Sequence, residues 1–279
     1  MNVRLPVTLA ELFAALEEPG ARVLAGGTDL LVQLRSRAGA HGSQTLVGLE
    51  RIRELQGITA TDGVIRIGAA ETHASILENR LARSRLPLLT AALAELGGPA
   101  IRNMGTIGGN ACTASPAGDS LPPLYALEAE VELASRQGLR RMAISGFIQG
   151  PGRTSLERGE ILSALLVPQA KGFDLHHFEK VGRRSALAIA VVSLAALIRR
   201  DPSGRVLEAR LALGSVGPTV LRCPEAENLL TGRRLTLASL KPAAAALRRA
   251  VTPIDDVRAT AAYRRQVAGN LLLRLAVLA

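Results

Sequence analysis

The sequence has little of what several classes of protein require. Its two cysteines, Cys112 and Cys223, are too few for a disulfide framework or for an iron–sulfur cluster, which takes about four thiolates. The four histidines show no spacing typical of metal ligands. Any chemistry must therefore come from an organic cofactor or from hydroxyl, carboxylate and amide groups.

Aromatic residues make up 2% of the chain, and tryptophan is absent. The net charge is +10, but all but three of the 34 cationic residues are arginines, and they are scattered without a basic run. Proteins that hold nucleic acid use stacked aromatic side chains or basic arms. We therefore expect a basic surface that faces solvent or an acidic partner. Nucleic-acid binding is the alternative, and steep salt-dependent DNA binding would reveal it.

Long apolar runs are also missing. The longest candidate, residues 185–198, is shorter than the roughly 18 apolar residues of a membrane span, and it ends in Arg199 and Arg200. Residues 1–6 lack the apolar stretch of a signal peptide. We expect no membrane span and a cytoplasmic location.

Apolar residues are abundant instead, at 48% of the 279 residues, which is enough for one large domain or two ordinary ones. Thr8 and Glu11 have the spacing of a capping box at the start of a helix. The apolar pattern predicts helices near residues 9–16, 30–37, 72–77 and 88–96, and strands near 21–25, 45–49, 64–69, 131–134 and 160–168.

Polarity rises at residues 168–172, where we place a domain boundary. Beyond it the pattern predicts strands near 186–198 and 208–215, and then helices near 224–230, 237–250 and 259–278. Helices and strands alternate along the chain before the boundary, whereas after it the strands come first and the helices follow. The chain is therefore expected to be α/β in its first part and α+β at its carboxyl end.

The first of two glycine-rich loops, Ala25 to Leu30, lies between a predicted strand and a predicted helix. Gly26 and Gly27 permit left-handed backbone angles and the close approach of a ligand. Neighbouring N–H groups in such a turn converge on an anion such as a phosphate, and Thr28 adds a hydroxyl group. The spacing is neither GxGxxG nor that of a P-loop, and a turn of this kind is more often purely structural.

The second loop, residues 101–110, concentrates glycines, asparagines, Thr106 and Arg102, and residues 114–120 continue it as far as Asp119. We expect the whole stretch 101–120 to be rich in loops. Asp119 is open to two interpretations, as a simple turn or cap residue or as a ligand-binding carboxylate. Two such loops together would suit a long ligand with phosphates in its middle.

The two loops, read as AGGTDL and IRNMGTIGGN with ASPAGD following, resemble the flavin-binding medium subunit of molybdenum hydroxylases. That group includes xanthine dehydrogenase, aldehyde oxidoreductases and carbon monoxide dehydrogenase. Further similar stretches follow in the same order, so that the resemblance covers the whole chain, at residues 160–168, 178–184, 213–219 and 256–265.

The resemblance implies a bipartite FAD-binding fold of the vanillyl-alcohol-oxidase (PCMH) type over residues 1–170, split near residue 55, and a small α+β domain over residues 171–279. It also implies non-covalent FAD, because Thr28 stands where related flavoproteins often carry a tethering histidine. The cofactor-binding residues that it implies are Val23, Leu24, Ala25, Gly26, Gly27, Thr28, Asp29, Leu30, Leu96, Arg102, Asn103, Thr106, Ile107, Gly108, Gly109, Asn110, Asp119, Leu162 and Lys180.

Within that set, Val23 to Leu30 are expected to wrap the diphosphate, and Thr106 to Asn110 to hold it from the other side. Asp119 is expected to accept hydrogen bonds from cofactor hydroxyls, while the remaining positions line the cofactor. The sequence departs from the family in two places. Leu96 replaces an aromatic residue, and residues 187–189 lack a carboxylate that often follows the Lys-x-x-Arg-Arg stretch.

The implied function is electron transfer from the 2Fe–2S clusters of a partner subunit, through FAD, to an external acceptor such as NAD. Molybdopterin and the 2Fe–2S clusters are expected only on partner subunits, in a heterotrimer or its dimer. Because the flavin carries the redox chemistry, no catalytic side chain and no metal ligand are expected on this chain. A stand-alone flavin oxidoreductase of the same fold remains the alternative.

Overall fold

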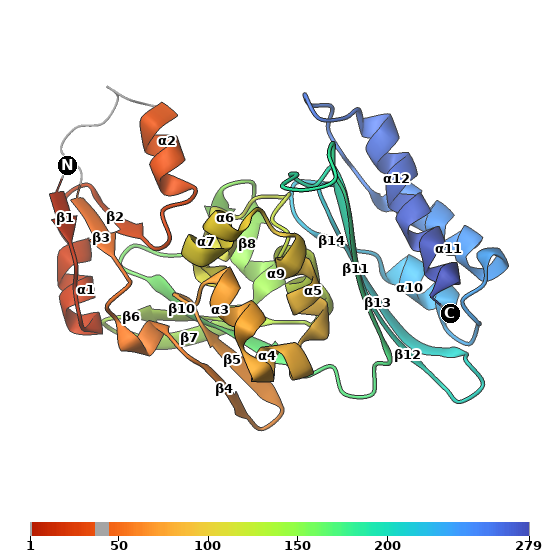
Figure 1. The fold of residues 1–279 in the computed structure, drawn as a ribbon, viewed down its shortest axis with the longest axis horizontal. Helices are drawn as coiled ribbons and strands as arrows, with labels where there is room; N and C mark the ends of the chain where they lie inside the picture. The colour runs from red at the N-terminus through yellow and green to blue at the C-terminus, as the bar shows by residue number, and fades with distance from the viewer. Residues whose placement is uncertain (1, 37–44, 279) are drawn as a thin grey trace.

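A computed structural model describes residues 2–36 and 45–278, and Figure 1 shows its sheets side by side. The first sheet is parallel, with the order β1 (Asn2–Arg4), β3 (Thr45–Gly48), β2 (Ala21–Leu24). Helix α1 (Leu9–Leu16) buries Leu12 and Phe13 against it. Helix α2 (Leu30–Ser36) follows β2 and has no buried residue.

The start of α1 differs in one detail from the predicted capping box. The Thr8 hydroxyl accepts a hydrogen bond from the Glu11 N–H at 3.2 Å, as the spacing predicts. The Glu11 carboxylate, however, accepts from the Val7 N–H at 2.9 Å, one residue earlier than the reciprocal bond requires. The predicted start of the helix is therefore confirmed, but the predicted bond from the Thr8 N–H to the Glu11 carboxylate is wrong.

The second sheet is antiparallel, and a short helical turn, η1 (Arg53–Leu55), leads into it. Its strands lie in the order β4 (Ile58–Thr61), β5 (Val64–Gly68), β10 (Ile161–Pro168), β6 (Glu130–Ser135), β7 (Gly138–Ala143). Side chains such as Ile65 and Leu133 share one core with residues of α3 (His73–Glu78), α4 (Arg80–Arg85), α5 (Pro87–Glu95), α7 (Ile107–Thr113), α8 (Leu121–Ala126) and α9 (Ile144–Phe147). Helix α6 (Pro99–Met104), between α5 and α7 in the chain, has no buried residue. A small hairpin, β8 (Ile148–Gly150) and β9 (Arg153–Thr154), lies beside these helices.

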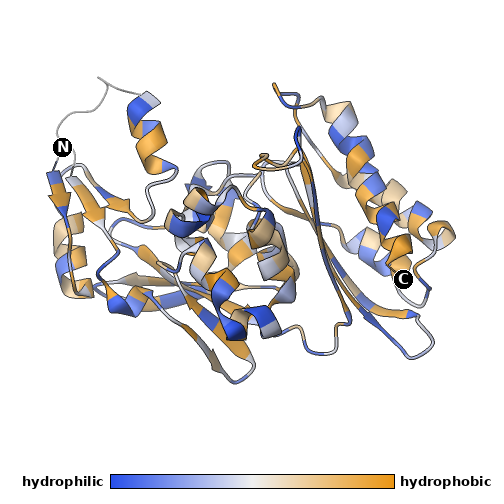
Figure 2. Ribbon diagram, in the orientation of Figure 1, coloured by the Kyte–Doolittle hydropathy of each residue, from blue (hydrophilic) through white to orange (hydrophobic). Residues whose placement is uncertain are grey.

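The third sheet is antiparallel, in the order β11 (Leu175–Val181), β12 (Val192–Arg200), β13 (Val206–Gly214), β14 (Leu221–Arg222). Successive side chains of a strand point to opposite faces. Ala195 and Leu197 therefore join the core of the second sheet, whereas Leu194 and Ile198 pack toward α10 (Pro224–Leu230), α11 (Leu237–Ala250), α12 (Ala261–Leu273) and η2 (Arg274–Val277). Figure 2 shows apolar residues along these strands.

Two predicted boundaries are wrong. The strand predicted from residue 186 begins at Val192, because residues 183–189 form an exposed connection in which Leu187 has a positive φ of 57°. The stretch 101–120, predicted to be rich in loops, contains the end of α6 and the whole of α7, and Thr106 caps α7 by accepting the Gly109 N–H. The helix predicted to reach about Arg37 is described as far as Ser36, and Arg37 itself lies outside the described residues.

Over residues 2–36 and 45–278, no helix combines the length and the apolar character needed to cross a bilayer.

Candidate functional site

The two glycine-rich loops meet in the folded chain. A Cβ atom on Gly26 would lie 1.7 Å from the Met104 carbonyl oxygen, so the first loop rests directly on the backbone of the second. Ala25 faces Gly109, where a Cβ atom would lie 3.8 Å from that of Ala25. The contact depends on glycine at position 26, because any side chain there would separate the loops.

The first loop presents a row of free donors. Among the described residues, no acceptor is hydrogen-bonded to the N–H groups of Gly26, Gly27 or Thr28. Gly27 has a φ of +70°, the left-handed backbone that turns neighbouring N–H groups toward a common point. Asp29, at the base of α2, accepts a hydrogen bond from the Thr113 hydroxyl at 3.1 Å, which ties the loop to the end of α7. This arrangement suits an anion.

In the second loop, by contrast, the backbone N–H groups of residues 107–110 donate hydrogen bonds within the protein. The N–H of Ile107 bonds to Glu71, that of Gly108 to Ala69, and those of Gly109 and Asn110 to Thr106, at 2.9 to 3.0 Å. Gly108 packs so tightly that a Cβ atom would lie 2.7 Å from the Ala69 carbonyl oxygen. The second loop therefore offers a ligand small residues and the side chain of Asn110, whose Oδ1 accepts from Ser120 at 2.6 Å.

A buried ion pair joins the carboxyl-terminal sheet to the loop that follows α7. Lys180, on β11, places its ammonium 2.7 Å from Oδ2 of Asp119 and donates a second bond to the Glu95 carbonyl at 2.6 Å. The Lys180 and Asp119 side chains are 5% and 8% exposed. Burial raises the pKa of Asp119 to about 6, and the bond from Lys180 opposes this rise. Oδ1 of Asp119 is buried without a partner among the described residues, so it can accept a hydrogen bond from a ligand.

Four other residues that the family resemblance assigns to the cofactor site lie in a turn, in the main core or on the surface of α6. Arg102 donates to the Leu96 and Gly97 carbonyls at 3.0 and 2.9 Å and so holds the turn between α5 and α6. Leu96 and Leu162 are 7% and 3% exposed and belong to the main core. Asn103 is exposed on α6, beside the junction of the loops.

Sequence reasoning missed His73, which lies beneath the junction of the loops. It is 2% exposed, its N–H donates to the Gly105 carbonyl at 3.0 Å, and its ring packs against Gly105. Burial, with a smaller effect of the Arg102 charge, lowers the pKa of His73 to about 4, so the ring is neutral. The sequence has no signal for this role, because Thr72 and His73 read as an ordinary helix start distant from both loops.

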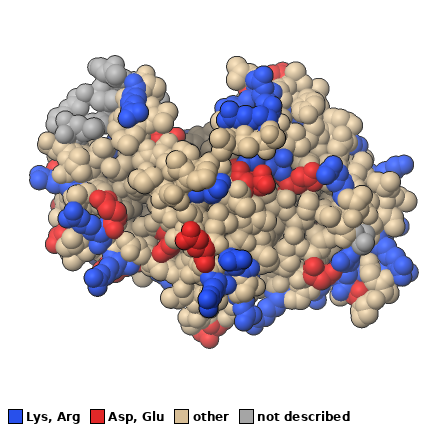
Figure 3. Space-filling model, in the orientation of Figure 1, with Lys and Arg blue, Asp and Glu red and all other residues tan. Residues whose placement is uncertain are grey.

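The molecule is hollowed above these residues. Figure 3 shows the hollow between α2 and the carboxyl-terminal sheet, and Figure 1 places α6 and α7 beneath it. Free N–H donors, a buried acceptor and two glycine loops in contact define a binding protein for an extended, partly anionic organic cofactor.

Comparison with known proteins identifies the family. A model of the FAD binding domain in molybdopterin dehydrogenase matches residues 1–170, and one of the CO dehydrogenase flavoprotein C-terminal domain matches residues 176–278. The chain is 37% identical over 260 residues to the xanthine dehydrogenase FAD-binding subunit of Escherichia coli, covering 92% of this chain and 88% of that one. It is 30% identical over 279 residues to the nicotinate dehydrogenase FAD-subunit of Eubacterium barkeri, covering 98% and 93%.

Solved structures agree. Carbon monoxide dehydrogenase of Hydrogenophaga pseudoflava superposes with a TM-score of 0.91 at 31% identity, covering 98% of this chain and 95% of that one. Quinoline 2-oxidoreductase of Pseudomonas putida superposes with a TM-score of 0.94 at 28% identity, covering 100% and 96%. The chain belongs to the family of FAD-binding subunits of molybdenum hydroxylases, a class of oxidoreductases. The predicted family, fold class and cofactor are confirmed.

Proposed function

We propose that this chain holds FAD across the contact of its two glycine loops and passes electrons from a 2Fe–2S partner subunit to an external acceptor such as NAD. The observation that carries the proposal is the row of free N–H groups at Gly26, Gly27 and Thr28, held against the second loop by the Gly26–Met104 contact. When bound, FAD supplies the redox chemistry. The protein supplies binding, orientation and exclusion of water.

In this proposal the diphosphate lies on the first loop, where the free N–H groups of residues 26–28 neutralise its charge. Residues Thr106 to Asn110 of the second loop line the other side of the space that the diphosphate occupies. They leave room for the ligand because two of them are glycines. Asn110 contributes its side-chain amide. The first loop thus supplies most donors, and the second mainly supplies room.

Asp119 and Lys180 orient the flavin end of the cofactor. The free Oδ1 of Asp119 accepts a hydrogen bond from a cofactor hydroxyl, while Lys180 holds Oδ2 and so keeps the carboxylate aimed. Leu96 and Leu162 are core residues that shape the walls of the site. Arg102 and Asn103 frame the turn on which the second loop begins.

We also propose two domains, residues 1–170, split near 55, and residues 171–279. The separate sheets and the two family models support this division. The printed names of relatives, such as medium chain and FAD-binding subunit, support partner subunits that carry the molybdenum cofactor and the 2Fe–2S clusters. Cys112 and Cys223 are free thiols, which accords with a cytoplasmic location.

Gly109→Val tests the binding site. A Cβ atom at position 109 would lie 2.9 Å from the Thr106 hydroxyl oxygen and 3.8 Å from the Cβ of Ala25, so the side chain would enter the space between the loops beside the start of α7. We expect the purified variant to lose the flavin absorption bands and to release no FAD on acid treatment, while its circular dichroism spectrum stays that of the unmodified chain. Full flavin occupancy in Gly109→Val would show that the cofactor is bound elsewhere.

The electron transfer proposal needs the complex. We expect the chain to co-purify with its partner subunits and, in that complex, the bound flavin to be reduced by the complex's substrate and reoxidised by NAD. An isolated chain that turns over a small substrate by itself, with no larger complex on size exclusion of native extract, would favour a stand-alone flavin oxidoreductase instead.

A further inference from the structure

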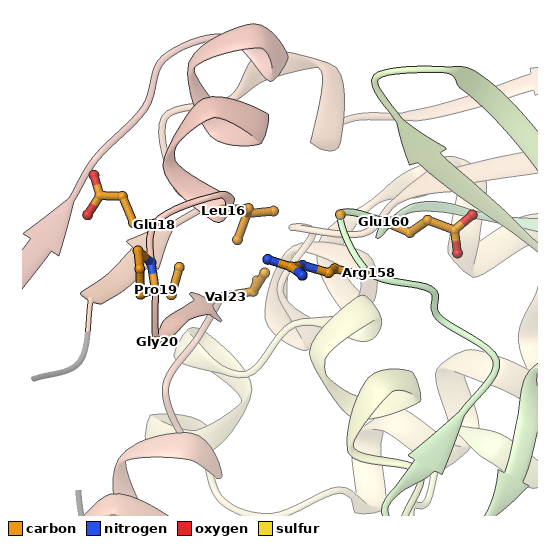
Figure 4. A pocket seen from close by; sticks show the side chains of 9 residues that line it. Leu16, Glu18, Pro19, Gly20, Val23, Arg158 and Glu160 are labelled. Atoms are coloured by element: carbon orange, nitrogen blue, oxygen red, sulfur yellow. The ribbon is translucent and has the colours of Figure 1, made fainter. Parts of the chain in front are cut away.

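Two hollows on the surface differ in the charge of the side chains that line them. The one shown in Figure 4, between the first sheet and the loop before β10, is lined by two glutamates as well as by Arg158. The other, of about 380 Å³, lies beside α10 and α11, and it is lined by Arg205, Arg233 and Arg234 and by no carboxylate of the described residues. We call this second hollow the arginine pocket.

The backbone holds two of these arginines directly opposite each other. Arg205, in the turn between β12 and β13, forms an isolated antiparallel bridge with Arg234, which lies between α10 and α11. The Val206 N–H donates to the Arg233 carbonyl and the Gly232 N–H donates to the Val206 carbonyl, both at 2.8 Å, and these bonds fix the pairing. Like charges on directly opposite residues destabilise a pair of strands. The fold therefore concentrates positive charge here against this repulsion.

The described residues do not neutralise this charge. Over residues 2–36 and 45–278, the guanidinium groups of Arg233 and Arg234 make no hydrogen bond and no ion pair. The Arg205 guanidinium donates to the Gly232 carbonyl at 2.9 Å, which fixes the side chain without removing its charge. Asp201, the acidic residue of the same turn, uses Oδ1 to accept backbone N–H groups of that turn at 2.8 and 2.9 Å. The pocket therefore suits an anionic ligand.

Apolar side chains form another wall of the arginine pocket. Leu229 on α10 and Ala238 and Pro242 on α11 line it. The Leu229 side chain is one of the large apolar groups that stay exposed, at 37%. A ligand that meets the arginines and also covers this wall has an anionic group on an apolar body, because each part then removes the matching surface from water.

We propose that the arginine pocket binds a phosphate monoester, with Arg233 and Arg234 on the phosphate and Leu229 and Pro242 against the organic part. A phosphate monoester has about two negative charges and three free oxygens. Guanidinium groups match it because they are planar and present paired N–H donors to its oxygens. Figure 1 places α10 and α11 across the third sheet from α6 and α7, so the inference does not rest on the proposed FAD site.

Titration calorimetry of the full-length chain, with FAD present and at constant ionic strength, tests this site. We expect phenyl phosphate to bind saturably, and more tightly than inorganic phosphate because its ring contacts the apolar wall. In Arg234→Gln the Kd for both probes should rise about tenfold, because a charge-assisted contact is lost. Leu229→Gln should weaken phenyl phosphate alone. Arg265→Gln, on the exposed side of α12 and outside the pocket, is the matched control and should leave both constants unchanged.

The other outcomes overturn the inference. Absence of saturable binding would show that the pocket takes no phosphate. An unchanged Kd in Arg234→Gln would show that phosphate binds elsewhere, and equal weakening in Arg265→Gln would show attraction to the net charge of the chain. Equal Kd values for the two probes, or no effect of Leu229→Gln, would rule out the organic part of the ligand. A chain that binds phenyl phosphate as expected but no FAD would overturn the proposed function and leave this inference standing.

Discussion

Lys180 of the carboxyl-terminal sheet and Asp119 of the loop before α8 form a buried ion pair with a 2.7 Å separation between Nζ and Oδ2. The same ammonium also bonds to the Glu95 carbonyl at the end of α5. One side chain from the last part of the chain thus holds two segments beside the proposed cofactor site. The carboxyl-terminal sheet therefore contributes a side chain that positions residues of that site.

Lys180→Met should destabilise the protein by about 3 kcal/mol, because it leaves the buried Asp119 carboxylate without its cation. Urea unfolding of the flavin-free chain measures the loss. Adding Asp119→Asn to the variant should recover part of it, since the uncompensated charge is then gone. Arg4→Met, which breaks the exposed Arg4–Glu18 pair, is the control and should cost less than about 1 kcal/mol. Equal losses in the two single variants would contradict a buried role for Lys180.

Asp119 should make the flavin-free chain less stable as the pH rises from about 4 to about 6. Its pKa is raised from 3.8 to about 6 in the folded state. Over this interval the folded state therefore holds a proton that the unfolded state has released, and stability falls with increasing pH. The free energy of unfolding of Asp119→Asn, minus that of the unmodified chain, should grow through this interval and level off above pH 7. A difference that stays constant with pH would contradict the raised pKa.

His73 should change the pH dependence of the free energy of unfolding in the opposite direction. Its pKa is lowered from 6.5 to about 4, so between these values the unfolded state binds a proton that the folded state refuses, and stability falls as the pH falls. The shift corresponds to about 3 kcal/mol lost by pH 4. His73→Leu, which has a similar volume and does not titrate, should lack this loss in urea unfolding measured from pH 7 to pH 4. Parallel curves for the two proteins would rule out a buried neutral histidine.

Gly26→Ala should abolish flavin retention, because the new Cβ atom would lie 1.7 Å from the Met104 carbonyl oxygen and force the loops apart. The ratio of flavin absorbance to protein absorbance after gel filtration measures retention. Gly146→Ala is the matched control, since its Cβ atom would meet only the flexible end of Met142 at 3.3 Å. Normal flavin content in Gly26→Ala would show that the loop contact is not needed.

Several local features follow from neighbouring residues and could be predicted. Thr8 and Thr72 each begin a helix by accepting an N–H three residues on, as their position before apolar residues at helical spacing indicates. Gly27 of the first loop also stands where the backbone takes a left-handed turn. The second loop was harder to predict, because Gly108 and Gly109 serve close packing within α7 and not a turn.

The amino-acid order by itself determined the helix starts, the apolar strands and the two glycine-rich stretches, because each depends on residues within a few positions of one another. The tertiary structure alone decided that Gly26 rests on Met104, that His73 lies beneath Gly105 and that Lys180 reaches Asp119. These contacts join distant parts of the chain, so they exist only when three sheets pack together and remove the groups from water. For the same reason the pKa values of Asp119 and His73 are properties of the fold, because burial in the packed structure shifts them.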